Sequence, residues 1–136
     1  MNKELNEEKK RPILIADDDA LFLHIVSKIL TEAGFEVITA GSGEEALKIL
    51  SRKNPALIIL DSNMPKMSGE EVCKKLKKSE SNKRTIPIII LSGLEDEDSI
   101  KRFTESGCDD YFPKSKLIYN FSSALKEKVY KALKSL

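Results

Sequence analysis

The sequence predicts an α/β fold, a doubly wound sheet of five parallel strands with helices on both faces. Patterns typical of strands and helices alternate five times along the 136 residues, and the apolar runs of the strands are continuous. Continuous runs, without alternating polar residues, are typical of strands that are covered on both faces, as in a parallel sheet. A chain of this length with 40% hydrophobic residues can bury the core of one such domain.

The domain is expected to span residues 11–136, preceded by a charged tail over residues 1–10. The tail lacks the apolar stretch of a signal peptide, and no apolar run approaches the roughly 18 residues of a membrane span. We therefore expect a cytoplasmic protein without a membrane partner. Its 23 basic and 22 acidic residues leave a net charge of +1, so charge does not indicate nucleic-acid binding.

The first strand is expected over residues 12–16 and the first helix over residues 19–33. Apolar residues recur in this helix with the helical period and should face the sheet. Leu21 and Leu23 fall partly outside that stripe. We favour a wide buried face for the helix, and the alternative is a docking surface for a helix of another protein.

The second unit is expected to contain a strand over residues 35–39 and a helix over residues 43–52. Gly34 stands where a left-handed residue commonly ends a helix, and Ser42 stands where an N-cap is expected. The unit is therefore bounded on both sides by residues suited to those positions.

The third unit has the clearest strand, an apolar run over residues 56–60 that ends abruptly at Asp61. Ser68 is expected to cap a helix over residues 69–78. The polar residues 82–85 indicate a loop before the next strand.

The last two units complete the sheet. A strand over residues 86–91 leads to a helix over residues 98–106, whose end is marked by Gly107. The strand over residues 109–112 should lie at an edge of the sheet, where the missing N–H of the proline that follows it is tolerated. A helix over residues 116–135 closes the domain.

The cysteines and the histidine exclude several kinds of site. Cys73 and Cys108 are far apart in sequence and have no histidines nearby, so we interpret them as small buried apolar residues. His24 is the only histidine, which excludes most histidine-dependent catalysis and any multi-histidine metal site.

Acidic side chains gather at one edge of the predicted sheet. Asp61 follows the third strand, and Asp17 and Asp18 follow the first. The carboxyl ends of parallel strands border one crevice, so these carboxylates should lie close together. Two like charges about 4 Å apart repel by about 4 kcal/mol at an effective dielectric near 20. Either a carboxyl is protonated or a hard divalent cation neutralises the cluster, and room for water among oxygen ligands favours Mg²⁺.

Capping is the alternative role for the first group of acids. Asp17 to Asp19 precede a helix, where a carboxylate can cap the N-terminus and interact favourably with the helix dipole. Capping is a sufficient role for Asp19. For Asp17 and Asp18 we favour metal binding, because Asp61 is expected beside them.

A cation and a hydroxyl are expected at the same edge. Lys114 follows the fifth strand and can pair with Asp61, while Ser92 ends the region of the fourth strand. An aspartate, a divalent metal, a lysine and a hydroxyl together suit phosphoryl transfer to a carboxylate. No further base is evident for turnover on a separate substrate, so the protein itself is expected to be the phosphate acceptor.

Two other functions compete with this interpretation. A metal-dependent phosphotransferase or nuclease would need a second strand with paired acids, whereas the third strand ends in the single carboxylate of Asp61. A flavodoxin-like cofactor binder would need a phosphate-binding loop after the first strand, where this chain has three carboxylates that repel anions.

In order and spacing these residues resemble the response-regulator receiver domains of two-component signalling, and in particular the stand-alone chemotaxis receiver. The resemblance covers residues 11 to about 135. It rests on Asp17-Asp18, Asp61-Ser62-Asn63-Met64-Pro65-Lys66-Met67-Ser68-Gly69, Ser92-Gly93, and Tyr111 placed three residues before Lys114.

The resemblance implies a flavodoxin-like strand order 2-1-3-4-5 and assigns roles to individual residues. Asp61 would be phosphorylated, and Mg²⁺ would be held by Asp18, Asp61 and the backbone carbonyl of Asn63, with Asp17 acting largely through water. Ser92 would follow the phosphoryl group.

Tyr111 would then turn inward and change the surface formed by the fourth helix, the fifth strand and the fifth helix. The alternative for Tyr111 is an ordinary half-buried strand aromatic.

The resemblance also implies partners. A sensor histidine kinase or a phosphohistidine relay protein would supply the phosphoryl group, and the chain would catalyse its own phosphorylation and dephosphorylation without being an enzyme for another substrate. The sequence contains no recognisable DNA-binding module, so we expect output through protein contacts, as a diffusible switch or as a relay. The protein would be a single-domain regulator, either monomeric or dimeric on phosphorylation.

One position departs from the family pattern. Family members usually have a proline after the lysine, joined by a cis bond, whereas Lys114 is followed by Ser115. A cis bond costs roughly 3 to 4 kcal/mol without proline, so we predict a trans bond.

Overall fold

The computed structural model describes residues 11–79, 82–93, 96–114 and 120–134. The expected N-terminal tail and the Lys114–Ser115 bond lie outside the described residues. No helix within these ranges is both long enough and apolar enough to cross a membrane.

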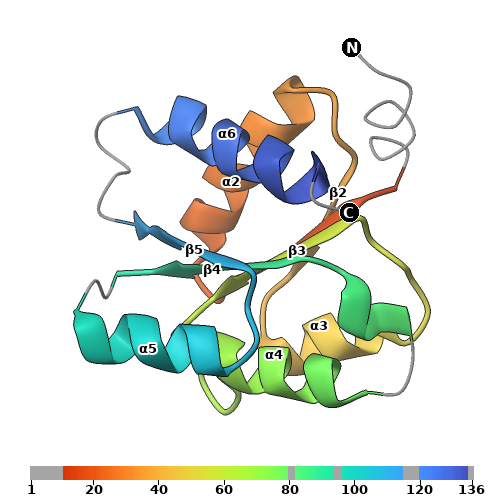
Figure 1. The fold of residues 1–136 in the computed structure, drawn as a ribbon. Helices are drawn as coiled ribbons and strands as arrows, with labels where there is room; N and C mark the ends of the chain where they lie inside the picture. Colours follow the sequence, from red (N-terminus) through yellow and green to blue (C-terminus); the bar gives the residue numbers. More distant parts are fainter. Residues whose placement is uncertain (1–10, 80–81, 94–95, 115–119, 135–136) are drawn as a thin grey trace.

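Five parallel strands form a single sheet with the order β2-β1-β3-β4-β5, which confirms the predicted flavodoxin-like architecture (Figure 1). Their bounds are β1 Ile13–Ala16, β2 Val37–Ala40, β3 Leu57–Asp61, β4 Ile88–Ser92 and β5 Asp110–Pro113. Strand β5 lies at an edge, as predicted. The register pairs Asp61 with Leu91 and Ser92 with Pro113, so the carboxyl ends of neighbouring strands finish at one side of the sheet.

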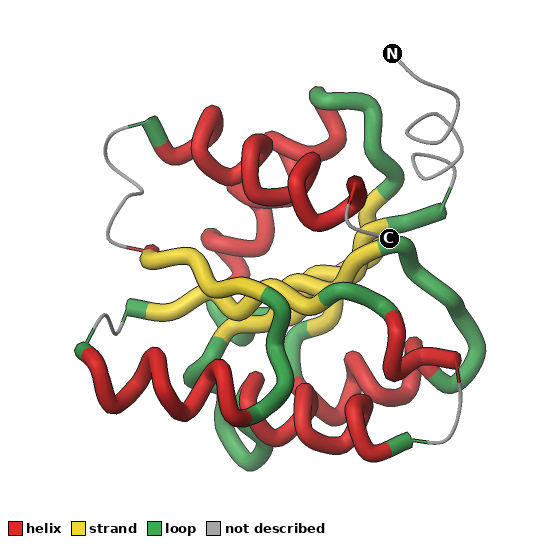
Figure 2. Tube along the Cα trace, in the orientation of Figure 1, coloured by secondary structure: helices red, strands yellow, loops and turns green. Residues whose placement is uncertain are grey.

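Helices cover both faces of the sheet (Figures 1 and 2). Helices α2 (Ala20–Glu32) and α6 (Phe121–Lys134) lie on one face. Helices α3 (Gly43–Leu50), α4 (Gly69–Lys78) and α5 (Glu97–Glu105) lie on the other. This three-layer arrangement explains why the strand sequences are apolar at every position.

Successive strand residues contribute to two separate cores. Ile13 and Ile15 pack in the core beneath α2 and α6, whereas Leu14 and Ala16 pack in the core beneath α3, α4 and α5. The two-residue period of a strand therefore decides which layer each side chain meets. The same period determines the direction of the polar side chains at the strand ends.

The residues that were predicted to cap or to end helices do so in the structure. Gly34 and Gly107 both have φ of +97°, the left-handed conformation that glycine adopts without steric cost. Ser42 accepts a hydrogen bond from the backbone N–H of Glu45, and Ser68 accepts one from that of Glu71. Both serines are N-caps.

Strand β2 and the connection before β4 differ from the sequence predictions. Strand β2 begins at Val37 and not at residue 35, because the amide of Phe35 donates to the carbonyl of Leu30 and closes the end of α2. Residues 82–85 form a short 3₁₀ helix, η1, and not an irregular loop. Lys77 of α4 donates to the carbonyl of Arg84 and holds this turn.

The interpretation of the first helix as having a wide buried face is wrong for Leu21. Leu23 packs against the core, but Leu21 is 67% exposed. Leu21 lies in the first turn of α2, two residues after the N-cap Asp19, and its side chain is open to solvent.

The two thiols and His24 occupy ordinary positions. Cys73 is fully buried and Cys108 is partly buried against the same core, and burial raises the pKa of both thiols, to about 12 for Cys108. These cysteines are therefore protonated, apolar core residues at neutral pH. His24 lies exposed on α2.

Gly69 allows the start of α4 to approach the carboxyl end of β3. A Cβ at Gly69 would overlap the backbone oxygen of Asp61 and lie 3.1 Å from its carbonyl carbon. We predict that Gly69→Ala lowers the free energy of unfolding by about 1 to 3 kcal/mol, because backbone atoms must move to make room. Urea unfolding measures the change.

The matched control is Gly41→Ala. A Cβ at Gly41 would meet only the carboxylate of Glu45, at an ordinary 3.6 Å. Its substitution should change stability by less than that of Gly69. Equal losses for the two variants would show that the close approach at Gly69 has no special cost.

Candidate functional site

Three carboxylates meet where β1 and β3 end. Oxygen atoms of Asp17, Asp18 and Asp61 all lie within 4.8 Å of one another. Asp17 is fully buried and Asp61 is 4% exposed, whereas Asp18 faces solvent. They line an open cavity of about 500 Å³ together with Asn63 and Lys114. The structure thus brings the predicted acids, the lysine and Asn63 to one place.

The strand alternation accounts for this convergence. Asp17, Asp61 and Lys114 each come an even number of residues after strand residues that pack beneath α2 and α6, namely Ile15, Ile59 and Phe112. All three side chains therefore belong to the same face of the sheet. Asp17 and Asp61 follow the neighbouring strands β1 and β3, whereas β4 separates β3 from β5, so the long side chain of Lys114 reaches past the end of β4 to the two acids.

Lys114 joins the two buried acids. Its ammonium nitrogen lies 2.9 Å from Asp17 Oδ2 and 3.0 Å from Asp61 Oδ1. Charge-assisted hydrogen bonds of this length partly compensate for burying two carboxylates. Lys114 also lies 4.3 Å from the ring centroid of Phe22, in the range of a cation–π contact.

Phe22 is one of the apolar residues of the first helix that recur with the helical period and were expected to face the sheet, and the structure gives it this further contact. Its ring meets Phe121 edge-on at a centroid distance of 5.8 Å, and Phe121 lies 5.4 Å from Phe112. The three rings form a wall beside Lys114. The sequence offered one signal for this contact, since Phe22 lies in the first turn of the helix that follows the first strand and belongs to the sheet-facing stripe.

Burial changes the acidity of the central carboxyl. Burial, together with the negative charge of Asp17, raises the pKa of Asp61 to about 6, although the hydrogen bond from Lys114 acts in the opposite direction. Burial by itself lowers the pKa of Lys114, but the hydrogen bonds and charges of Asp17 and Asp61 outweigh it and raise that pKa. Lys114 is therefore cationic, whereas Asp61 titrates close to neutrality.

The donor atoms suit a hard divalent cation. Asp17 has both oxygens engaged, since Oδ1 accepts from the backbone N–H of Asp19 and Oδ2 accepts from Lys114. Asp18 is exposed, and both Asp18 and Asn63 line the cavity. Carboxylate and carbonyl oxygens with open solvent beside them are the ligands that Mg²⁺ prefers, because it keeps several waters.

The structure does not bring Ser92 and Tyr111 to the acids. Ser92 is fully buried and is absent from the described residues that line the cavity, whereas Ser62 and Gly93 are among them. The Ser62 hydroxyl donates to Ser92 Oγ at 2.9 Å, a contact that the sequence analysis missed. Both serines continue the alternation of strand residues that pack beneath α3, α4 and α5.

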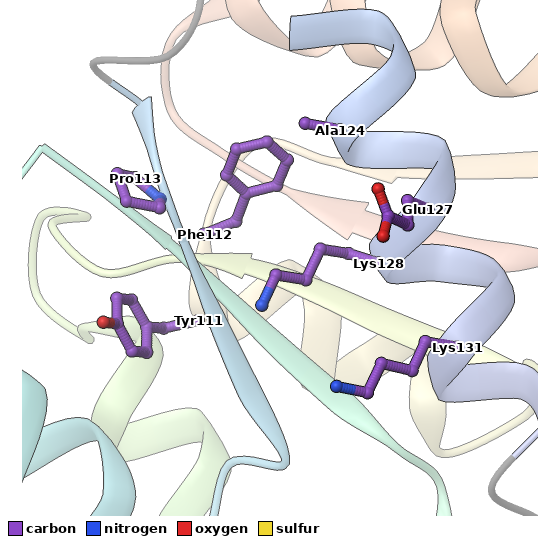
Figure 3. Close-up of a pocket in the computed structure, with 7 residues that line it drawn as sticks. All are labelled: Tyr111, Phe112, Pro113, Ala124, Glu127, Lys128 and Lys131. Carbon is purple, nitrogen blue, oxygen red and sulfur yellow. The ribbon is translucent and has the colours of Figure 1, made fainter. Parts of the chain in front are cut away.

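Tyr111 is half-buried on the face of the sheet that α3, α4 and α5 cover. Its ring lies 6.5 Å from that of Phe103 on α5. Figure 3 shows Tyr111 on the side of β5 opposite to Phe112 and α6. A cavity of about 370 Å³ lies along β5 and α6, where Lys128 pairs with Asp110 at 2.9 Å.

The arrangement supports nucleophilic chemistry at Asp61. A carboxylate oxygen is available at the floor of an open cavity, a cation lies against it, and oxygen ligands for a divalent metal surround it. These groups can stabilise the negative charge of a phosphoryl group while the carboxylate attacks it.

Comparisons with known proteins agree with the fold. The family model for the response regulator receiver domain matches residues 13–125. The probable transcriptional regulator ycf27 of Porphyra purpurea is 42% identical over 108 residues, which cover 79% of this chain and 43% of the relative.

Solved structures show the same fold. The signal receiver domain of a signal transduction histidine kinase from Syntrophus aciditrophicus superimposes with a TM-score of 0.83 at 33% identity, covering 93% of this chain and 92% of that chain. The receiver domain of the sensor histidine kinase PA1611 of Pseudomonas aeruginosa, which has a magnesium ion coordinated in its active site cleft, superimposes with a TM-score of 0.80 at 20% identity, covering 90% and 97%.

The chain belongs to the response regulator receiver domain family. It spans about two fifths of the length of the curated relatives that it matches. Several of those relatives are transcriptional regulators, and the family relationship concerns the receiver domain that this chain shares with them.

The raised pKa of Asp61 predicts a pH-dependent affinity for Mg²⁺. Below a pKa of about 6 a proton occupies the carboxyl, so the affinity should rise with pH by up to about tenfold per unit and level off above it. Calorimetric titration with MgCl₂ from pH 5 to pH 8 measures this. Asp61→Asn is the control and should remove the rise, and a flat profile for the original protein would contradict the prediction.

The same pKa predicts how stability depends on pH without metal. The folded protein keeps a proton on Asp61 that the unfolded chain releases above a pKa near 3.8, so the free energy of unfolding should fall as pH rises from about 4 to about 6. The contribution of Asp61 is isolated by subtracting the profile of Asp61→Asn. A difference that increases with pH would contradict the assigned direction.

Proposed function

We propose that the protein is a response regulator in which Asp61 accepts a phosphoryl group in a Mg²⁺-dependent reaction. The donor is a sensor histidine kinase or a phosphohistidine relay protein. The observation that supports this most directly is the position of Asp61, whose nearly buried carboxylate contacts Lys114 at the floor of an acidic cavity. The family relationship supports the same assignment.

The transfer step follows from these contacts. A carboxylate oxygen of Asp61 attacks the phosphorus, and the bond between phosphorus and the donor histidine nitrogen breaks, with its electron pair returning to that nitrogen. Lys114 stabilises charge on the transferred oxygens. Mg²⁺, when bound by Asp18, Asp61 and the carbonyl of Asn63, with Asp17 acting through water, supplies charge neutralisation.

We propose further that the chain promotes its own phosphorylation and dephosphorylation and does not turn over a separate substrate. A phosphoaspartate is an acyl phosphate, and water can attack its phosphorus and regenerate the carboxylate. The cavity beside Asp61 is open, so water can approach. A metal-dependent phosphotransferase or nuclease is less well supported, because β3 ends in a single carboxylate.

The signalling surface is proposed to include α5, β5 and α6. Ser92 would turn toward the phosphoryl group and Tyr111 would move inward behind it. The cavity along β5 and α6 would then change shape, since Tyr111 lines it (Figure 3). A downstream protein would detect this change, with the regulator acting either as a diffusible switch or as a relay, as a monomer or as a phosphorylation-dependent dimer. We propose that the receiver acts in the cytoplasm and binds no nucleic acid directly.

Exposed Leu21 is proposed to contribute to docking of the phosphodonor. It lies in the first turn of α2, two residues after Asp19, which lines the acidic cavity. An apolar side chain that is 67% exposed next to a reactive site provides area for a partner's helix.

Asp61→Asn tests the phosphoacceptor. Incubation with Mg²⁺ and acetyl phosphate should add one phosphoryl group to the original protein, detected by intact mass, and none to the variant, because an amide oxygen is a poor nucleophile. Asp19→Asn is the matched control, since it also removes an acid of the cavity but keeps an N-cap side chain. It should still form the adduct. A Mg²⁺-dependent adduct on Asp61→Asn would refute the assignment.

Tyr111→Ala tests the switch. The variant should form the Asp61 adduct to the same extent as the original protein, because Tyr111 does not line the acidic cavity. Its amide NMR signals in β5 and α6 should shift at least threefold less when beryllofluoride is added, whereas those of Tyr111→Phe should shift normally. Equal responses of Tyr111→Ala and the original protein would assign Tyr111 an ordinary packing role.

A further inference from the structure

The side chain of Ser92, at the end of β4, accepts a hydrogen bond from a residue that follows the adjacent strand β3. Ser62 follows Asp61 directly, and its hydroxyl donates to Ser92 Oγ at 2.9 Å. Ser62 is 7% exposed and Ser92 is fully buried, so water has little access to this pair. A hydrogen bond between two buried hydroxyls has to be replaced by another before either group can leave without loss of stability.

The side chains of the two serines lie on one face of the sheet, and the side chain of Asp61 lies on the other. Asp61 continues the alternation of Leu57 and Ile59, which pack beneath α2 and α6. Ser62 continues that of Ile58 and Leu60, which pack beneath α3, α4 and α5, and Ser92 continues that of Ile88 and Ile90 on the same side. A Ser92 hydroxyl bonded to Ser62 is therefore directed away from the face that carries the acceptor carboxylate.

We propose that Ser62 is a positioning residue that retains Ser92 in the unphosphorylated arrangement. Ser62 donates to Ser92 Oγ, so an anion on Asp61 that accepts from the Ser92 hydroxyl has to draw this oxygen away from its donor. Ser62 lines the acidic cavity and also contacts Ser92, so it lies between the site of phosphorylation and the residue expected to respond. This inference rests on the proposed phosphoacceptor function and adds a residue that sets how readily the switch operates.

The prediction concerns the affinity for beryllofluoride, a phosphoryl mimic, in the presence of excess Mg²⁺. Ser62→Ala should bind it about fivefold more tightly than the original protein, because the unliganded form no longer has the hydrogen bond that must be broken. Titration followed by ¹⁹F NMR or calorimetry gives the dissociation constant. The affinity for Mg²⁺ alone should not change, because Ser62 is not among the proposed ligands.

A double-mutant cycle shows whether the effect passes through Ser92. In a Ser92→Ala background, Ser62→Ala should have no further effect on beryllofluoride affinity. Ser106→Ala is the matched control for loss of a buried hydroxyl, because Ser106 is 3% exposed and bonds to the carbonyl of Phe103 at the end of α5. It should leave the affinity unchanged, and urea unfolding confirms that each variant is folded.

The outcomes separate this inference from the proposed function. Unchanged or weaker binding by Ser62→Ala would overturn the retaining role, and so would an effect of equal size in the Ser92→Ala background. If the original protein bound beryllofluoride and formed the Asp61 adduct, the proposed function would stand in either case. If it did neither, the proposed function would fail, and the role of Ser62 would fail with it.

Discussion

The rest of the site depends on the ammonium of Lys114 lying between two buried carboxylates. Asp17 and Asp61 repel each other in a region with little water, and Lys114 contacts both within 3.0 Å. Burial is the largest cause of the raised pKa of Asp61, and the charge of Asp17 adds to it, because one cation cannot balance two ionised acids. The site is therefore short of positive charge, and a divalent cation at Asp18 would supply it. The proposed affinity for metal would follow from this electrostatic deficit, and the bound metal would then supply the positive charge that an incoming anion requires.

The geometry of the sheet explains why this deficit can be maintained. Continuous apolar strands, covered by helices on both faces, hold the carboxyl ends of β1, β3 and β5 in fixed positions. The phase of each strand then decides which polar side chain reaches which face. A shift of one residue in β3 would move Asp61 away from Lys114 and bring Ser62 in its place. The chemistry of the site is therefore a consequence of strand register.

Much of this arrangement could be predicted from the sequence. The strand order, the caps at Ser42 and Ser68 and the meeting of Asp17, Asp61 and Lys114 follow from apolar runs, turn residues and the rule that parallel strands end at one edge. The start of β2 could not be predicted, because the amide of Phe35 is used to close α2. Leu21 and Leu23 both fall partly outside the apolar stripe, and only the packing over the first turn of α2 shows that Leu21 is exposed. The strand alternation places Ser62 and Ser92 on the same face of the sheet, the one that α3, α4 and α5 cover. Their pairing could not be predicted without the register of β3 and β4.

The aromatic wall beside Lys114 restricts how the sequence can diverge. Phe22 belongs to α2, Phe112 to β5 and Phe121 to the first turn of α6, so three elements distant in the chain share one set of ring contacts. A smaller side chain at one of these positions leaves space that the other two have to fill, and it also moves the surface on which the ammonium lies. Positions 22, 112 and 121 should therefore covary among close homologues, with a loss of volume at one position matched by a gain at another.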